Sequence, residues 1–179
     1  ERVFAPTLSM PWRGYQQIDQ EYGRYGRGDV NVDLRFKNEK DSQLGMPLPA
    51  GRIRVMQSDP DDGSLEFIGE DVIDHTPRNE EVLIEMGNAF DVVGERKQTD
   101  FRVDVASRNL WETFEIRLRN HKDEAVNIAV VENLYRMANW KIENASHKHS
   151  KENSNRIGFD VEVPSEGEAV IRYTVHYWW

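Results

Sequence analysis

Apolar and polar residues alternate along most of this chain, so that every second side chain is apolar. The alternation is regular from Val30 to Phe36 and again from Ile157 to Val163. A period of two places alternate side chains on one face of an extended strand, so each run predicts a strand with one buried face. No comparable stretch shows the 3.6-residue period of an amphipathic helix. The pattern therefore predicts an antiparallel all-β protein.

Further alternating runs bring the expected total to about ten strands, with turn residues every 8–12 positions, roughly the spacing of sandwiches and barrels. The clearest hairpin joins runs at 53–55 and 65–67 through Asp59-Pro60-Asp61-Asp62-Gly63. Proline presets φ and glycine accepts a positive φ, which suits a tight turn. Residues 146–155 are expected to form a polar loop, and no internal repeat is evident.

We expect three segments along the chain. Residues 1–29 form an irregular lead-in, 30–106 an antiparallel β module, and 107–179 an immunoglobulin-like β-sandwich module. The core of that last module is expected to contain Phe114, Trp140, Phe159 and Tyr173. A single larger sandwich is the alternative.

The charge of the chain is strongly acidic and unevenly distributed. Net charge is −9, and residues 57–91 hold eleven acidic residues but one basic residue, Arg78. Such a surface repels phosphate backbones, so we expect no nucleic-acid partner. The segment Arg24-Tyr25-Gly26-Arg27-Gly28 has the composition of a nucleic-acid-binding tail, but acidic neighbours favour a flexible loop.

Several classes of protein and site are excluded or not expected. The chain has no cysteine, which excludes disulfides, thiolate metal sites and cysteine nucleophiles. No window reaches the roughly 18 apolar residues of a membrane span. The chain begins at Glu1 without an apolar leader, so we interpret it as a fragment or a processed chain. No phosphate loop or dinucleotide motif is present, and we expect no cofactor.

Two groups of residues are candidate metal ligands. Asp59, Asp61 and Asp62 place three carboxylates in one glycine-containing turn, as a hard cation requires. Their spacing does not match a calcium loop, so a solvated turn is the simpler interpretation. His147 and His149 would share one face of a strand, which permits transition-metal binding, but no third ligand is near in sequence.

A polar cluster of Asp71, Asp74, His75 and Arg96 is the remaining candidate site. Asp74 could orient His75 as a general base, which would make the chain a hydrolase. Adjacent residues on a strand point to opposite faces, however, so we predict no catalytic constellation. Arg96 and Lys97 are expected to neutralise nearby acids such as Asp71, Asp74 or Glu95. A buried arginine–carboxylate pair would fix the register between the two modules.

Aromatic residues offer a further binding hypothesis. Their flat faces stack well on sugar rings, and the candidates are Trp111, Trp140, Trp178, Trp179 and the tyrosines. Core packing is the simpler interpretation, and we expect Trp178 and Trp179 to anchor the end of the chain against the sheet.

Four ordered motifs resemble a bacterial family. They are Leu48-Pro49-Ala50-Gly51-Arg52-Ile53-Arg54-Val55, Phe67-Ile68-Gly69-Glu70-Asp71-Val72-Ile73-Asp74-His75-Thr76-Pro77, Ala89-Phe90-Asp91-Val92-Val93-Gly94-Glu95-Arg96-Lys97-Gln98-Thr99-Asp100-Phe101 and Arg119-Asn120-His121-Lys122-Asp123-Glu124. Together they resemble the domain-of-unknown-function 4139 family, which is related to the C-terminal part of mucoidy-inhibitor-A-like proteins. The resemblance implies an exported protein of the periplasm or cell envelope, with no established activity or catalytic residues.

These observations lead to one expected function and two alternatives. We expect a non-enzymatic module that binds other domains of its parent chain or an envelope protein. The first alternative is a carbohydrate- or cation-binding module, and the second is a hydrolase centred on Asp74 and His75.

Overall fold

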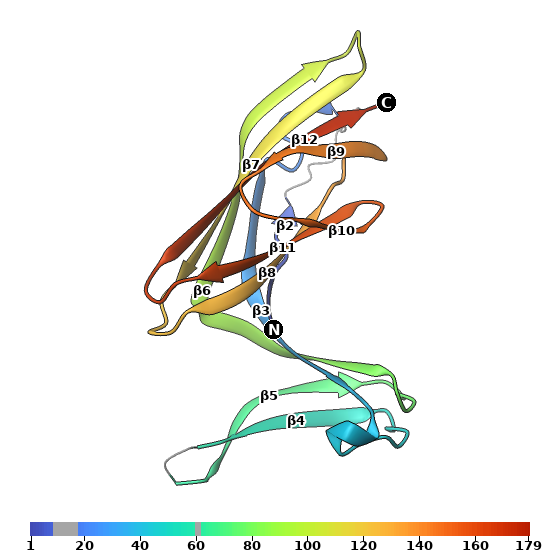
Figure 1. The fold of residues 1–179 in the computed structure, drawn as a ribbon, viewed down its shortest axis with the longest axis vertical. Helices are drawn as coiled ribbons and strands as arrows, with labels where there is room; N and C mark the ends of the chain where they lie inside the picture. Colours follow the sequence, from blue (N-terminus) through green and yellow to red (C-terminus); the bar gives the residue numbers. More distant parts are fainter. Residues whose placement is uncertain (9–17, 60–61) are drawn as a thin grey trace. The chain divides into compact units, whose positions relative to one another are not determined.

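The structure is a computed structural model that describes residues 1–8, 18–59 and 62–179, and it consists almost wholly of strands (Figure 1). The predicted antiparallel all-β class is confirmed. The strands are β1 (Arg2–Phe4), β2 (Thr7–Leu8), β3 (Tyr25–Lys37), β4 (Gly51–Ser58), β5 (Leu65–Ile73), β6 (Glu81–Asp104), β7 (Asn109–Asn120), β8 (Val126–Asn133), β9 (Asn139–Ala145), β10 (Ser150–Asn153), β11 (Arg156–Val163) and β12 (Glu168–Trp178). A short 3-10 helix, η2, covers Lys40–Ser42. None of the helices in the described ranges has the length and apolar character that crossing a membrane requires.

The chain divides into two compact units. Unit 1 contains Glu1–Arg2 and Asn31–Asn88, and unit 2 contains Val3–Val30 and Ala89–Trp179. These units differ from the expected modules, because residues 89–106 belong with the C-terminal strands. The physical reason is strand pairing: β6 pairs antiparallel with β7 from Val92 to Asp104, so its second half cannot belong to a separate N-terminal module.

Strand pairing also corrects three local expectations. The runs near 82–86 and 101–105 belong to one strand, β6, rather than two. The expected polar loop 146–155 contains β10, which pairs with β11 despite having no apolar residue. Residues 25–28 lie in β3 rather than in a flexible loop. In β10 and at residues 25–28, backbone hydrogen bonds and not an apolar alternation define the strand.

Unit 2 is built from a sheet that folds back over its own core. The strand order is β10–β11–β8–β1–β3–β6–β7–β12–β9, and β2 pairs with β3. The rings of Phe159 on β11 and Tyr173 on β12 lie 5.6 Å apart, so the β8–β11 side faces the β7–β12 side. Phe114, Phe159 and Tyr173 are buried in this core, and Trp140 packs against it half-buried.

Unit 1 has a much smaller core. The expected hairpin is present as β4 and β5, which pair from Gly51–Ile73 to Ser58–Leu65 with one bulge. Its inner face packs on the ends of β3 and β6 within the unit. The fully buried apolar side chains are Ile73, Val82 and Ile84.

The two units share one four-strand arrangement, formed by β3–β4–β5–β6 in unit 1 and β7–β8–β11–β12 in unit 2. The inner strands pair in the same way, with Ile53 opposite Asp71 in unit 1 and Ile128 opposite Val161 in unit 2. The outer strands are also neighbours in both units, as β3 with β6 and β7 with β12.

A buried asparagine marks the equivalent point of each unit. Asn38 and Asn120 follow the similar segments 34–37 and 116–119, which read Leu-Arg-Phe-Lys and Ile-Arg-Leu-Arg. The Asn38 Nδ2 donates to the carbonyl oxygen of Pro77, and the Asn120 Nδ2 donates to that of Pro164, both at 3.0 Å. Their backbone N–H groups donate to Glu80 and Gly167, both at 2.9 Å. Unit 1 is therefore a smaller version of the arrangement in unit 2.

Candidate functional site

Five large apolar side chains are exposed on the β4–β5 hairpin of unit 1. They are Met56, Leu65, Phe67, Ile68 and Val72, and each is between 41% and 66% exposed. Met56 lies opposite Phe67 in the strand register, so these two side chains share one face of the hairpin. We call the five residues the hairpin surface. Single exposed apolar residues are normal on the surface of a monomer. A group of neighbouring exposed apolar residues, in contrast, marks an interaction site.

The fold itself does not require this apolar surface. Arg52 pairs with Val72 in unit 1 where Asn127 pairs with Glu162 in unit 2. Similarly, Phe67 stands where unit 2 has Gly158 and Leu65 where it has Arg156, whereas Met56 corresponds to the apolar Val131. The same strand pairing is thus compatible with a polar or small residue at three of the five positions, as unit 2 demonstrates.

The hairpin also has open backbone edges and several charged residues. Within the described residues, β4 and β5 pair only with each other, so each has an open edge. Glu70 binds Arg52 and accepts a hydrogen bond from the Arg54 Nε at 3.1 Å. The hydrogen bond from Arg54 lowers the pKa of Glu70. Toward the turn the charge is acidic, with Asp59, Asp62 and Glu66.

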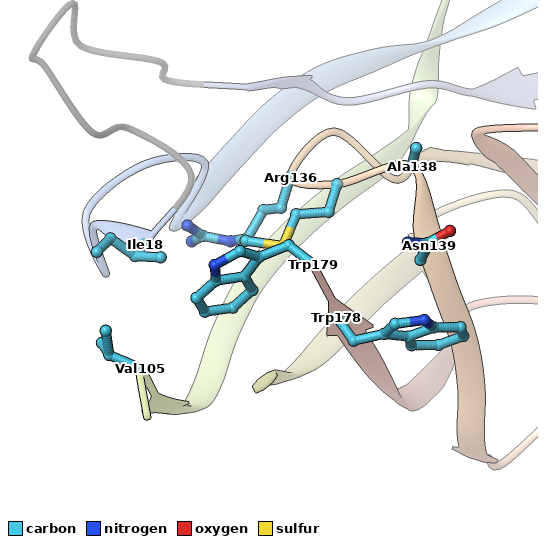
Figure 2. A pocket seen from close by; sticks show the side chains of 8 residues that line it. Ile18, Val105, Arg136, Ala138, Asn139, Trp178 and Trp179 are labelled. Atoms are coloured by element: carbon cyan, nitrogen blue, oxygen red, sulfur yellow. The ribbon is translucent and has the colours of Figure 1, made fainter. Parts of the chain in front are cut away.

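Unit 2 contains a pocket of about 600 Å³ at the end of β12 (Figure 2). Its lining is Ile18, Val105, Arg136, Met137, Ala138, Asn139, Trp178 and Trp179. Trp178 and Trp179 are partly exposed, and the Trp179 backbone N–H donates to the Arg108 carbonyl oxygen at 3.2 Å. The two tryptophans therefore line a pocket as well as tying down the end of the chain.

The guanidinium of Arg136 is buried beside this pocket. Its Nη2 lies 2.7 Å from the Glu112 Oε1, and both side chains are fully buried. Arg136 also donates to the carbonyl oxygens of Asp19 at 2.9 Å and Tyr22 at 2.8 Å. Since Glu112 balances the charge of Arg136, this pair presents no net charge to the pocket and holds the turn at 19–24 in place.

A second buried pair holds the same turn from the other side. The Arg96 Nε donates to the Glu132 Oε2 at 2.7 Å, and its Nη1 donates to the Gly23 carbonyl oxygen at 2.8 Å. The Tyr173 hydroxyl donates to the same Glu132 oxygen. Burial opposes the charge of Arg96, but the Glu132 carboxylate outweighs it, so the pKa of Arg96 lies above its usual value. The guanidinium stacks 3.8 Å above the Phe114 ring.

The predicted polar cluster does not form as expected. Arg96 belongs to unit 2 and binds Glu132, not Asp71 or Asp74, because Glu132 occupies an inward-facing position on the facing strand β8. Asp71 accepts hydrogen bonds from backbone N–H groups, including that of Glu85 at 2.9 Å. These backbone donors lower the pKa of Asp71.

Asp74 and His75 are not arranged as an acid–base pair. The Asp74 Oδ1 accepts the backbone N–H of His75 at 2.7 Å, not a proton of its ring. The His75 Nδ1 accepts the backbone N–H of Ala50 at 3.2 Å. Both residues thus cap backbone groups at the end of β5.

The metal candidates are engaged in local turns. The Asp62 Oδ1 accepts the Ser64 backbone N–H at 2.8 Å, and Asp61 lies outside the described residues. The His147 Nδ1 lies 2.9 Å from the Ser146 Oγ, and the His149 ring packs 6.1 Å from that of Phe159. In residues 1–8, 18–59 and 62–179, no three His, Cys, Asp or Glu side chains are placed to hold a metal ion.

The buried pairs were missed by the sequence analysis, although a signal for them exists. Glu112 and Glu132 stand at the inward-facing positions of β7 and β8, and Arg96 stands at such a position on β6. A charged residue in the apolar phase of a strand must be paired when it is buried. The oppositely charged residues in that phase therefore predict ion pairs, though not which partners meet.

In comparisons with known proteins, no family model, no curated protein and no solved structure matches this chain. The resemblance to the domain-of-unknown-function 4139 family therefore stays a prediction from the motifs.

Proposed function

We propose that this chain is a non-enzymatic interaction module of an exported bacterial protein. Its hairpin surface binds a protein, either another domain of the parent chain or an envelope protein. The observation that carries this proposal is the set of five exposed apolar side chains on the hairpin, three of which (Leu65, Phe67 and Val72) stand at positions that are polar or small in unit 2. The family resemblance is the support for export, and the facing strand layers of unit 2 support an immunoglobulin-like sandwich as its fold type.

The proposal is non-enzymatic because the geometry favours structural roles for the candidate catalytic groups. Asp74 and His75 bind backbone N–H groups at the end of β5. The buried pairs Arg96–Glu132 and Arg136–Glu112 are used to hold the turn at 19–24. A general base must reach the proton that it removes from the substrate. Glu112 and Glu132 are buried, so a substrate has no access to them.

A retention experiment tests the proposal with a matched control. The chain is immobilised and exposed to envelope extract, in parallel with the variants Met56→Ser/Phe67→Ser and Phe90→Ser. Phe90 is 95% exposed and belongs to unit 2, so its variant removes a similar exposed aromatic at another place. We expect one partner to be retained by the unmodified chain and Phe90→Ser and lost by the double variant. Equal retention by all three chains, or no retained partner, would contradict the proposal.

A second candidate function rests on the pocket of unit 2. Its volume of about 600 Å³ falls within the range of small-molecule sites, on the order of 300–1,000 Å³. The exposed apolar lining comes from Trp178, Trp179, Val105 and Met137, and Asn139 supplies an amide. We propose that the pocket takes a small uncharged ligand with a flat apolar face, in agreement with the ring-binding hypothesis from the aromatic residues.

Tryptophan fluorescence tests this second candidate. Titration with the neutral aromatic 2-naphthol is compared with titration with methyl glucopyranoside. We expect saturable quenching by one of these probes, which Val105→Glu abolishes by placing a charge at the exposed edge of the pocket. Phe90→Ser serves as the control that keeps the response. Quenching that never saturates, or that survives Val105→Glu, would remove this candidate.

A further inference from the structure

The open edge of β4 in unit 1 has a covered counterpart in unit 2. β4 corresponds to β8, and β5 corresponds to β11, in the shared four-strand arrangement. In unit 2, β1 lies beside β8 and β10 lies beside β11. In unit 1, β4 and β5 lie beside each other, and no other described strand pairs with either of them. The same hairpin is therefore flanked on both edges in one unit and on neither edge in the other.

The strand beside β8 contributes to the core as well as to the sheet. β1 has three residues, and its last one, Phe4, is fully buried. Gly94 makes room for this ring, since a Cβ at Gly94 would collide with the Phe4 side chain. A short extended segment with one apolar anchor thus covers the β8 edge, with β3 paired on its other side.

The strand beside β11 behaves differently. All four residues of β10 are exposed, and none of them is apolar. An added strand at the β11 position therefore gains only backbone hydrogen bonds, whereas one at the β8 position also buries an apolar side chain. The β4 edge, which corresponds to the β8 edge, is the one where an incoming strand gains more free energy.

We infer that β4 binds an extended segment of a partner protein by β-strand addition, at the position that β1 occupies on β8. This inference rests on the proposed function and gives its binding mode. The segment carries apolar residues at alternate positions, to contact Met56 and its neighbours on the hairpin surface. It carries lysine or arginine at the end near the turn, because Asp59, Asp62 and Glu66 make that end acidic.

Two synthetic peptides test the binding mode. The first is a fluorescently labelled strand of roughly nine residues, a usual strand length, in which valine or phenylalanine alternates with threonine and two lysines close one end. The second has the same side chains, but the backbone nitrogens along one edge are methylated. Fluorescence anisotropy gives the dissociation constant of each peptide with the full chain, and hydrogen exchange shows which strand is protected.

Strand addition predicts a specific set of results. Methylation weakens binding by at least about tenfold, because it removes several intermolecular backbone hydrogen bonds. The unmethylated peptide slows amide exchange in β4 by about tenfold or more at saturation and leaves β12 unchanged. Phe90→Ser binds both peptides as the unmodified chain does.

Three other results would overturn the inference. The first is that both peptides bind with the same dissociation constant and that the double variant Met56→Ser/Phe67→Ser no longer binds either of them. That result would keep the hairpin surface as a docking site but would reject strand addition. Absence of binding by the unmethylated peptide at millimolar concentration would reject it as well. A dimer in sedimentation without peptide, with protected β4 amides, would show that a second copy of the chain occupies the edge.

Discussion

Replacing Arg96 by methionine is the perturbation whose effect the structure defines most fully. Methionine keeps much of the side-chain volume but removes the hydrogen bonds to Glu132 and to the Gly23 carbonyl oxygen. It also removes the guanidinium from its position 3.8 Å above the Phe114 ring. Glu132 would remain fully buried with the Tyr173 hydroxyl as its remaining donor. Breaking a buried pair in this way costs about 3–5 kcal/mol of unfolding free energy.

Urea unfolding of unit 2 measures this loss. Trp111, Trp140, Trp178 and Trp179 all lie in unit 2, so tryptophan fluorescence reports its unfolding. The double variant Arg96→Met/Glu132→Leu removes both charges, and we expect it to lie within about 2 kcal/mol of the unmodified chain.

A surface pair provides the control for this experiment. Arg119 and Glu95 form an ion pair at 2.7 Å with both side chains well exposed. Such pairs contribute about 0–1 kcal/mol, so Arg119→Met should hardly change the unfolding midpoint. If Arg96→Met cost no more than Arg119→Met, or if the double variant were no more stable than Arg96→Met, the assigned role of the Arg96–Glu132 pair would be refuted.

Three further results follow from the structure. Gly23→Ala should lower the free energy of unfolding in urea more than Gly63→Ala does. Both glycines have positive φ, so both variants are strained, but only a Cβ at Gly23 also collides with the Tyr135 hydroxyl. Equal losses would contradict this. Burial raises the pKa of Tyr135 from 10.0 to about 12, so its contribution to stability is complete below pH 10 and is lost as the pH rises toward 12. We expect the urea midpoint to fall between pH 9 and pH 11.5, and to fall less in Tyr135→Phe; a midpoint independent of pH would be inconsistent with this burial. Val72→Glu, which introduces the residue found at the equivalent position of unit 2, should leave the circular dichroism melting temperature within a few degrees, since Val72 is exposed; a large drop would assign Val72 to the core.

The strand pattern is the part of the fold that the sequence predicted well. Alternation from Val30 to Phe36 and from Ile157 to Val163 matches β3 and β11, because one face of each strand is buried. The hairpin around Asp59–Gly63 was predicted from its turn residues and is present as β4 and β5. Periodicity and turn chemistry are local properties, so they can be predicted without knowing which strands pair.

The pairing of strands could not be predicted in the same way. β6 continues from one unit into the other, and Gly87, which has a φ of 111°, is the one residue in its sequence that marks the end of unit 1 at Asn88. The repeat also escaped detection, because its most evident match is a short segment that ends at Asn38 in one unit and at Asn120 in the other. Only the hydrogen bonds of those two asparagines to Pro77 and Pro164 make the equivalence plain.

The candidate site was missed for a different reason. The apolar residues at Leu65, Phe67 and Val72 fit a strand pattern, and the alternation alone does not say which face of a hairpin is covered. Sequence analysis directed attention to acids and histidines, which the structure uses to cap turns. Exposure of these side chains depends on the folded hairpin, and the register of β4 on β5, set beside that of β8 on β11, shows which of them the fold does not require.

Site-specific photo-cross-linking in the parent protein, in its own cell, tests the role of the hairpin surface most directly. A photoreactive phenylalanine derivative replaces Phe67 in one strain and Phe90 in another, and the cross-linked peptides are mapped by mass spectrometry. We expect the derivative at position 67 to cross-link to one defined segment, in a partner or in another domain of the parent chain, and the derivative at position 90 to give no such product. The absence of a product from position 67, or the same product from both positions, would contradict the proposal that the hairpin surface is the docking site.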